Sequence, residues 1–161
     1  MVGKIAAMAD ARASDETLII ARTDAVAVDG FNAATDRAEA YVEAGADALF
    51  IEALRSVDEM KTVTERFKGR VPLLVNMVEG GATPIQNASF LNDLGFSIVI
   101  FPGGIVRALA HTAEAYYQSL MSTGSNRAFA DNMFDFGGLN ERLGTDEMLA
   151  LGKRYESGGH D

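Results

Sequence analysis

The chain has 161 residues, which is enough for one domain of ordinary size. It is 48% hydrophobic and 23% charged, and this composition excludes a disordered or low-complexity chain. Because 23 acidic residues outnumber 14 basic ones, the net charge is -9. Such a chain repels phosphate backbones and anionic lipid surfaces, so we expect neither nucleic acid nor a membrane as a partner.

The sequence contains no cysteine, which excludes a disulfide, a thiolate nucleophile and a Cys-bound zinc site. The N-terminal stretch carries Lys4 and then Asp10 within a short apolar segment, which is not the pattern of a signal peptide. No run approaches the roughly 20 apolar residues of a membrane span. We therefore expect a cytoplasmic protein.

Four short and continuous apolar runs predict strands buried on both faces, as in a parallel sheet covered by helices. The spacing of apolar residues predicts helices before, between and after these runs. In chain order, the predicted elements are a helix at 2–12, a strand at 17–21, a helix at 32–44, a strand at 47–51, a helix at 56–67, a strand at 71–75, a helix at 84–94, a strand at 97–101, a helix at 105–121 and a helix at 145–155.

The predicted strands begin near residues 17, 47, 71 and 97, so the βα unit repeats every 24 to 30 residues. This period is typical of a (β/α) barrel or of a doubly wound sheet. A complete eight-stranded barrel needs about 250 residues. The sequence therefore predicts an α/β fold, the C-terminal half of a (β/α)8 TIM barrel, and the alternative is a small open sheet of four parallel strands.

Residues 1–121 are predicted to form this half-barrel, as part of a catalytic domain. Residues 122–161 are predicted to form a C-terminal loop and helix, with an irregular stretch at 122–136 and a frayed tail at 157–161.

Polar or glycine-rich residues follow each predicted strand. Ligands of parallel α/β folds bind at the carboxyl ends of the strands, so we expect these residues to share one rim. They are Arg22 to Asp24 after the first strand, Glu52 after the second, Asn76 to Gly81 after the third, and Gly103, Gly104 and Arg107 after the fourth.

Each of these residues has a functional and a structural interpretation. Arg22 binds a substrate carboxylate or phosphoryl group, or forms an internal salt bridge with Asp24 or Glu52. Glu52 serves as an acid or base, or simply pairs with Arg22. Asn76 holds a carboxylate or enolate oxygen, or is a turn residue.

Further along the rim, Glu79 and Gly80 belong to a flexible loop, and Arg107 pairs with an anionic ligand or a surface acid. His111 has no second His, Asp or Glu at metal-ligand spacing, and His160 lies in the tail. No phosphate-binding loop, nucleophile elbow or zinc motif occurs.

Six segments of the sequence together resemble the isocitrate lyase/phosphoenolpyruvate mutase superfamily. The similarity is strongest to its 2,3-dimethylmalate lyase, 2-methylisocitrate lyase and carboxyphosphonoenolpyruvate phosphonomutase branch. The segments are Met1–Ala7 (MVGKIAA), Ile20–Ala25 (IARTDA), Ala44–Asp47 (AGAD), Phe50–Ala53 (FIEA), Val75–Gly81 (VNMVEGG) and Ile100–Gly104 (IFPGG).

The resemblance implies a (β/α)8 barrel, Mg2+, and a tetramer whose subunits exchange a terminal helix. It implies retro-aldol cleavage of a C–C bond in a 2-hydroxy di- or tricarboxylate such as an alkylmalate or methylisocitrate. On this basis Arg22 and Arg107 bind substrate carboxylate and Glu52 supports the acid–base network. Asn76 and the following Glu79 and Gly80 contact the substrate.

The resemblance covers only the second half of the family barrel. The family's metal-binding aspartates and its catalytic Cys loop belong to positions before Met1, and we expect this chain alone to be inactive. An arginine that some lyases use near the final loop has no counterpart at 131–141. Two alternatives stay open: a phosphonomutase or oxaloacetate-processing member, and a non-catalytic half-barrel that associates through its open edges.

Overall fold

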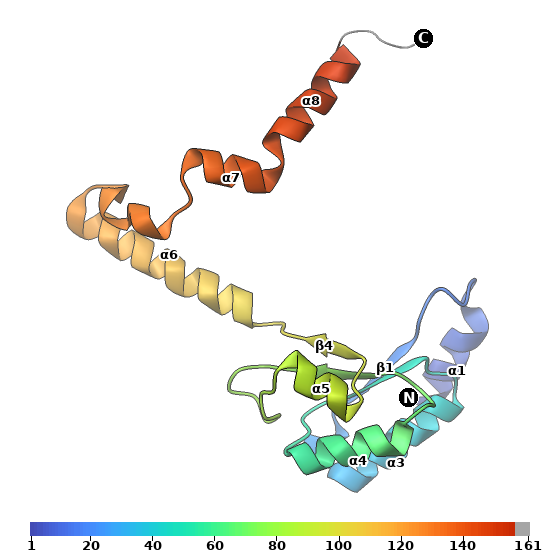
Figure 1. The fold of residues 1–161 in the computed structure, drawn as a ribbon. Coiled ribbons are helices and arrows are strands. Elements are labelled where there is room, and N and C mark those ends of the chain that lie inside the picture. Colours follow the sequence, from blue (N-terminus) through green and yellow to red (C-terminus); the bar gives the residue numbers. More distant parts are fainter. Residues whose placement is uncertain (157–161) are drawn as a thin grey trace. The chain divides into compact units, whose positions relative to one another are not determined.

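A computed structural model gives the fold of the chain and describes residues 1–156 (Figure 1). The chain divides into two compact units, Met1–Ile105 and Val106–Asp161, with the boundary just inside helix α6 (Gly104–Thr123). The predicted functional division at residue 121 stays a prediction. The predicted fraying of the tail concerns residues outside those described.

The first unit contains four parallel strands in the order β1-β2-β3-β4. The strands are β1 (Ile20–Thr23), β2 (Ala48–Ile51), β3 (Leu73–Asn76) and β4 (Ile98–Ile100). Each strand pairs with the next along the chain, so every crossover moves in the same direction. A barrel is built in this way, whereas the strand order of a doubly wound sheet reverses. The structure therefore confirms the predicted α/β half-barrel fold.

Five helices accompany these strands in the first unit, and they are α1 (Val2–Ala11), α2 (Ala25–Val28), α3 (Phe31–Glu43), α4 (Val57–Phe67) and α5 (Ala88–Leu94). The hydrophobic core forms between the helices and one face of the sheet. Ile5 of α1, Ala38 of α3, Met60 of α4 and Leu91 of α5 are each 1% exposed or less. They belong to one cluster with strand residues such as Leu49.

Local sequence explains where two of these helices begin. Ser56 accepts a hydrogen bond from the backbone N–H of Glu59 at 3.1 Å and so caps α4, as the predicted capping box requires. The helix predicted from Pro84 starts only at Ala88, because Asn87 is the residue that caps it, accepting from Phe90 N–H at 2.9 Å.

Helices α3 and α4 are also tied together by ion pairs. Arg66 contacts Asp36 and Glu39, and Arg70 contacts Glu39. Hydrogen bonding from Arg70 lowers the pKa of the Glu39 carboxyl below its ordinary value.

The described residues of the second unit form helices joined by short connections, and they contain more regular structure than predicted. After α6 come a 3-10 helix η1 (Asn126–Asn132), α7 (Phe136–Leu143) and α8 (Thr145–Glu156). The prediction had left 122–136 irregular and had not included α7. No helix in the described part of the chain has the length and apolarity of a membrane span.

Candidate functional site

Side chains along each strand point alternately to the helix-covered face of the sheet and to its second face, which we call the open face. Ala21 of β1, Leu49 of β2 and Leu73 of β3 point into the helix-covered core. Their neighbours on the open face are paired in register, and they include Arg22 with Phe50 and Asn76 with Ile100. The open face therefore carries two of the predicted site residues at the carboxyl ends of their strands.

Arg22 lies within β1, whereas the predicted strand ended at Ala21. Its guanidinium donates two hydrogen bonds to Asp24, from Nε at 3.1 Å and from Nη2 at 2.8 Å. Nη2 also lies 3.7 Å from the Glu52 carboxylate, and the ring centroid of Phe50 lies 4.9 Å from Cζ. Hydrogen bonding to Asp24 raises the pKa of the guanidinium above its ordinary value, so Arg22 stays a cation.

The Arg22 side chain is 54% exposed. Both structural partners suggested by the sequence, Asp24 and Glu52, are in contact with it. The cation is thus accessible to a ligand from solvent, although its own chain supplies two carboxylates.

Glu52 and Asn76 complete a line of contacts across three neighbouring strands. The Glu52 side chain is 20% exposed, and Nδ2 of Asn76 donates to its Oε2 over 3.4 Å. Oδ1 of Asn76 is buried and has no hydrogen-bond partner. Arg22, Glu52 and Asn76 therefore form a cation, an anion and a free acceptor side by side, a set that suits a ligand with both carboxylate and hydroxyl groups.

The backbone after Glu52 shows a feature that the sequence did not reveal. Ala53 has φ 64, the left-handed region that residues with a Cβ rarely adopt. Its neighbours are held firmly, since Glu52 N–H donates to Thr23 O at 2.9 Å and Leu54 is 1% exposed. A strained residue persists only where its surroundings determine its conformation in this way. No signal in the sequence distinguishes Ala53 from an ordinary loop alanine.

The remaining predicted site residues lie on the loop after β3 and on α6. Gly80 has φ 78, which explains glycine at that turn. Oε1 of Glu79 lies beside Gly104, where a Cβ would come within 3.3 Å of it. Arg107 is an exposed residue of α6 and belongs to the second unit. The structure thus brings Arg22, Glu52 and Asn76 together, and it places Glu79 beside the start of α6.

The described residues do not fit a Mg2+ site. No group of three His, Cys, Asp or Glu side chains in residues 1–156 is arranged to hold a metal ion. At the rim, Glu52 already faces the Arg22 guanidinium, which would repel a second cation.

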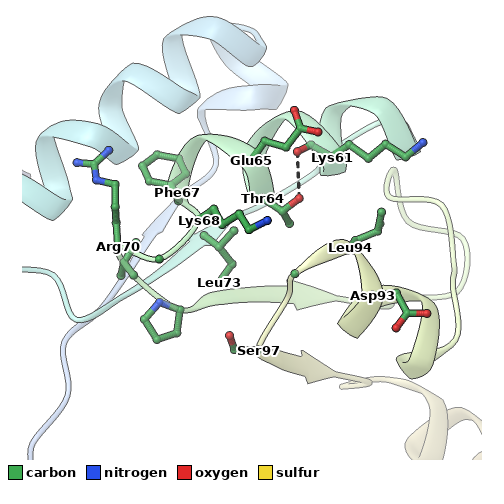
Figure 2. Close-up of a pocket in the computed structure, with 14 residues that line it drawn as sticks. Lys61, Thr64, Glu65, Phe67, Lys68, Arg70, Leu73, Asp93, Leu94 and Ser97 are labelled. Atoms are coloured by element: carbon green, nitrogen blue, oxygen red, sulfur yellow. Dashed lines mark hydrogen bonds between the residues drawn. The ribbon is translucent and has the colours of Figure 1, made fainter.

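A cavity of about 640 Å3 lies at the opposite end of the strands (Figure 2). It lies between the ends of α4 and α5 and the start of β3, with Phe67, Lys68, Leu73 and Ser97 among its lining residues. Since ligands of parallel α/β folds bind at the carboxyl ends of the strands, this cavity is not the candidate site.

A family model and individual relatives place the chain in the same protein family. The model of the phosphoenolpyruvate phosphomutase family matches residues 1–121. A 2-methylisocitrate lyase of Halalkalibacterium halodurans is 41% identical over 136 residues, which cover 84% of this chain and 45% of that protein. The chain spans about half the length of the curated relatives it matches.

Solved structures agree with this result. The crystal structure of a 2,3-dimethylmalate lyase is similar with a TM-score of 0.81 and 29% identity, over 96% of this chain and 54% of that one. A phosphonopyruvate hydrolase in complex with oxalate and Mg2+ gives a TM-score of 0.77 and 29% identity, with the same coverage.

Proposed function

The chain belongs to the phosphoenolpyruvate phosphomutase family, and on that premise we propose that it supplies the carboxylate-binding part of a carbon–carbon lyase active site. The substrate class is a 2-hydroxy di- or tricarboxylate of the alkylmalate or methylisocitrate type. The observation that carries the proposal is the line of contacts from Arg22 through Glu52 to Asn76 on the open face.

Each residue has a role in this proposal. The Arg22 guanidinium binds a substrate carboxylate and keeps its charge at any physiological pH. Glu52, held by Asn76, supports proton transfer at the substrate hydroxyl, and the free Oδ1 of Asn76 accepts a hydrogen bond from that hydroxyl. Glu79 and Gly80 contact the substrate from the β3–α5 loop. Arg107 of α6 is a separate candidate for binding a substrate carboxylate.

We propose that turnover also requires Mg2+, the ion that a similar phosphonopyruvate hydrolase holds together with oxalate. We propose that its ligands belong to a part of the enzyme outside residues 1–156, because the described residues do not fit the metal. The chain alone is then expected to bind substrate without turning it over.

Replacing Arg22 tests the proposal. Isothermal titration of the chain with 2,3-dimethylmalate and with oxalate should show that Arg22→Ala raises Kd at least about tenfold, because a charged hydrogen-bonding partner is lost. Arg37→Ala is the matched control, since Arg37 pairs with Asp29 on the exposed surface, and its Kd should not change. Equal affinities of the unsubstituted chain and Arg22→Ala, or no binding by the unsubstituted chain, would contradict the proposal.

A phosphonomutase or oxaloacetate-processing activity is the second candidate. The similarity to phosphonopyruvate hydrolase in complex with oxalate supports it. Titration with phosphonopyruvate separates the two candidates, because a site built for a phosphonate should prefer it to 2,3-dimethylmalate. A non-catalytic half-barrel would bind neither compound.

We also propose a cytoplasmic homo-oligomer in which residues 122–161 are exchanged between subunits, with a tetramer as the form of the complete enzyme. Large apolar side chains exposed in the second unit support this, such as Met121 at 87% and Phe136 at 88%.

A further inference from the structure

The Asp24 carboxylate contacts Arg22 in the way a carboxylate ligand would. Its two oxygens accept from two different nitrogens of the guanidinium, Oδ2 from Nε at 3.1 Å and Oδ1 from Nη2 at 2.8 Å. This two-point arrangement is the one in which arginine recognises carboxylates generally. A substrate carboxylate binding to the same edge of Arg22 would therefore have to replace Asp24.

The fold does not need this side chain elsewhere. Asp24 is the N-cap residue of α2, yet its carboxylate makes no capping hydrogen bond. Thr23 takes that role instead, with Oγ1 accepting from the Ala25 N–H at 3.2 Å. The Asp24 carboxylate thus binds Arg22 and does not cap the helix.

The pair is also easy to separate. The side chains of Arg22 and Asp24 are 54% and 59% exposed, and ion pairs with this much solvent contact add little stability. Glu52 is held more firmly than Asp24. Its side chain is only 20% exposed and receives a hydrogen bond from Asn76, and its carboxylate lies 3.7 Å from Nη2 of Arg22. Of the two carboxylates facing Arg22, Asp24 is the one that a ligand can displace.

We propose that Asp24 is an internal competitor for the substrate carboxylate. It holds the guanidinium while the site is empty, and it gives way to a ligand carboxylate that replaces both hydrogen bonds. It thereby lowers the affinity of the site for every anion and discriminates against anions that cannot match the two-point contact. This inference rests on the proposed carboxylate-binding role of Arg22.

Binding measurements on the whole chain test the inference. Asp24→Asn keeps a good N-cap residue but weakens the contact with Arg22, so the Kd for oxalate and for 2,3-dimethylmalate should fall about two- to fivefold. Asp24→Ser, another good N-cap residue, should change Kd in the same direction. The matched control is Asp29→Asn, which removes the same charge from a residue paired with Arg37. It reports the general effect of lower negative charge.

The outcomes separate the two proposals. Tighter binding by both Asp24 variants than by Asp29→Asn supports the competitor role. Unchanged or weaker binding by the Asp24 variants, with Arg22→Ala still weakening binding, overturns it and leaves the carboxylate-binding role of Arg22 standing. If Arg22→Ala binds as well as the unsubstituted chain, both proposals fail.

Discussion

At the scale of single residues, the rim contains polar groups that do not serve stability. Oδ1 of Asn76 is buried without a partner, a situation that typically lowers stability by about 1–3 kcal/mol. A turn asparagine, the structural interpretation suggested by the sequence, would have used this oxygen in the turn. Under the proposed function, a substrate hydroxyl would supply the missing donor beside Glu52.

Ala53 is a second residue near the candidate site whose conformation is energetically unfavourable. Its left-handed conformation, φ 64, raises the energy of an alanine by roughly 1–2 kcal/mol. The following turn shows why the conformation persists, because the backbone N–H of Arg55 donates to the Glu59 carboxylate and Leu54 is buried. The strain is thus imposed by both flanks of the loop that carries Glu52.

Substituting glycine at this position should relieve the strain. We expect Ala53→Gly to raise the free energy of unfolding by up to about 1 kcal/mol, since glycine adopts positive φ freely but gains entropy in the unfolded chain. Urea unfolding followed by circular dichroism measures this. Ala40→Gly, in the middle of α3, is the matched control and should lower stability by about 1 kcal/mol. Destabilisation by both substitutions would show that Ala53 is not strained.

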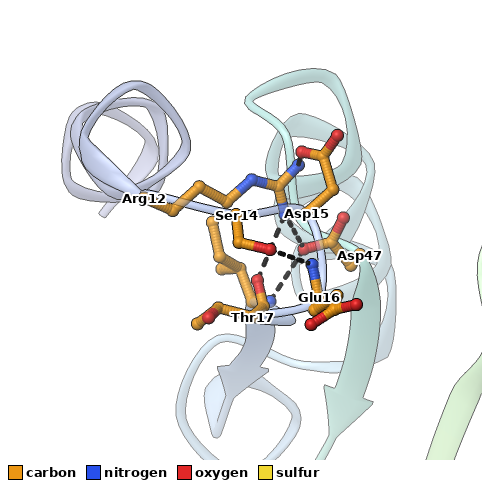
Figure 3. A network of polar contacts seen from close by, with 7 residues as sticks. Arg12, Ser14, Asp15, Glu16, Thr17 and Asp47 are labelled. Carbon is orange, nitrogen blue, oxygen red and sulfur yellow. Dashed lines mark hydrogen bonds and ion pairs between the residues drawn. The ribbon is translucent and has the colours of Figure 1, made fainter.

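At the scale of elements, a polar network fixes the segment between α1 and β1 (Figure 3). Oδ2 of Asp47 accepts from the backbone N–H of Ile19 at 2.8 Å and from Nη1 of Arg12 at 2.7 Å. Arg12 also contacts Asp15, whose side chain is 97% exposed. The network joins the start of β1 to the start of β2, at the end of the sheet opposite the candidate site.

The two acids of this network should differ sharply in their effect on stability. Asp47→Ala leaves the N–H of the buried Ile19 without its acceptor, so the free energy of unfolding should fall by about 1–3 kcal/mol. Asp15→Ala removes only a solvent-exposed partner of the same arginine and should change it by less than about 0.5 kcal/mol. Equal effects in urea titrations would assign the stability to the arginine charge rather than to the backbone hydrogen bond.

The sequence predicted the elements well where periodicity and caps agree. Four apolar runs became four parallel strands, and Ser56 began α4 as its capping box indicated. It failed where helices are short, because α2 has four residues and offers no apolar period to detect. It also failed at α7, whose signal lay in the Asp135 cap, accepting from Gly138 N–H, ahead of a glycine pair that disfavours helix.

The sequence predicted where the candidate site lies, at the carboxyl ends of the strands, but it did not predict which side chains contact one another there. Strand ends place Arg22, Glu52 and Asn76 on one side, and parallel pairing makes them neighbours. The sequence did not decide between a ligand and Asp24 as the partner of Arg22. The partner of Arg22 depends on how its side chain and that of Asp24, two residues later, are oriented in the folded protein. The positive φ of Ala53 likewise depends on the conformation of the folded loop, which the sequence alone does not reveal.

At the scale of the whole molecule, we predict that chains associate through the sheet of the first unit. β1 and β4 are its edge strands, and the open face carries apolar side chains such as Ile20, which is 47% exposed. Unpaired strand edges next to exposed apolar side chains favour pairing with another chain. A sheet that curves as half of a barrel would offer both of its edges at once.

We expect the 161-residue chain to form dimers or larger assemblies at micromolar concentration, and light scattering measures this directly. If the open face drives association, Ile20→Lys should shift the distribution toward monomer, because a charge is introduced where apolar surface would be buried. Ile85→Lys is the matched control, since Ile85 is exposed to the same degree, 50%, but lies outside the strands. A clean monomer of the unsubstituted chain would contradict the expectation. An equal response to both substitutions would place the contact elsewhere, with the exposed apolar helices of the second unit as the remaining surface.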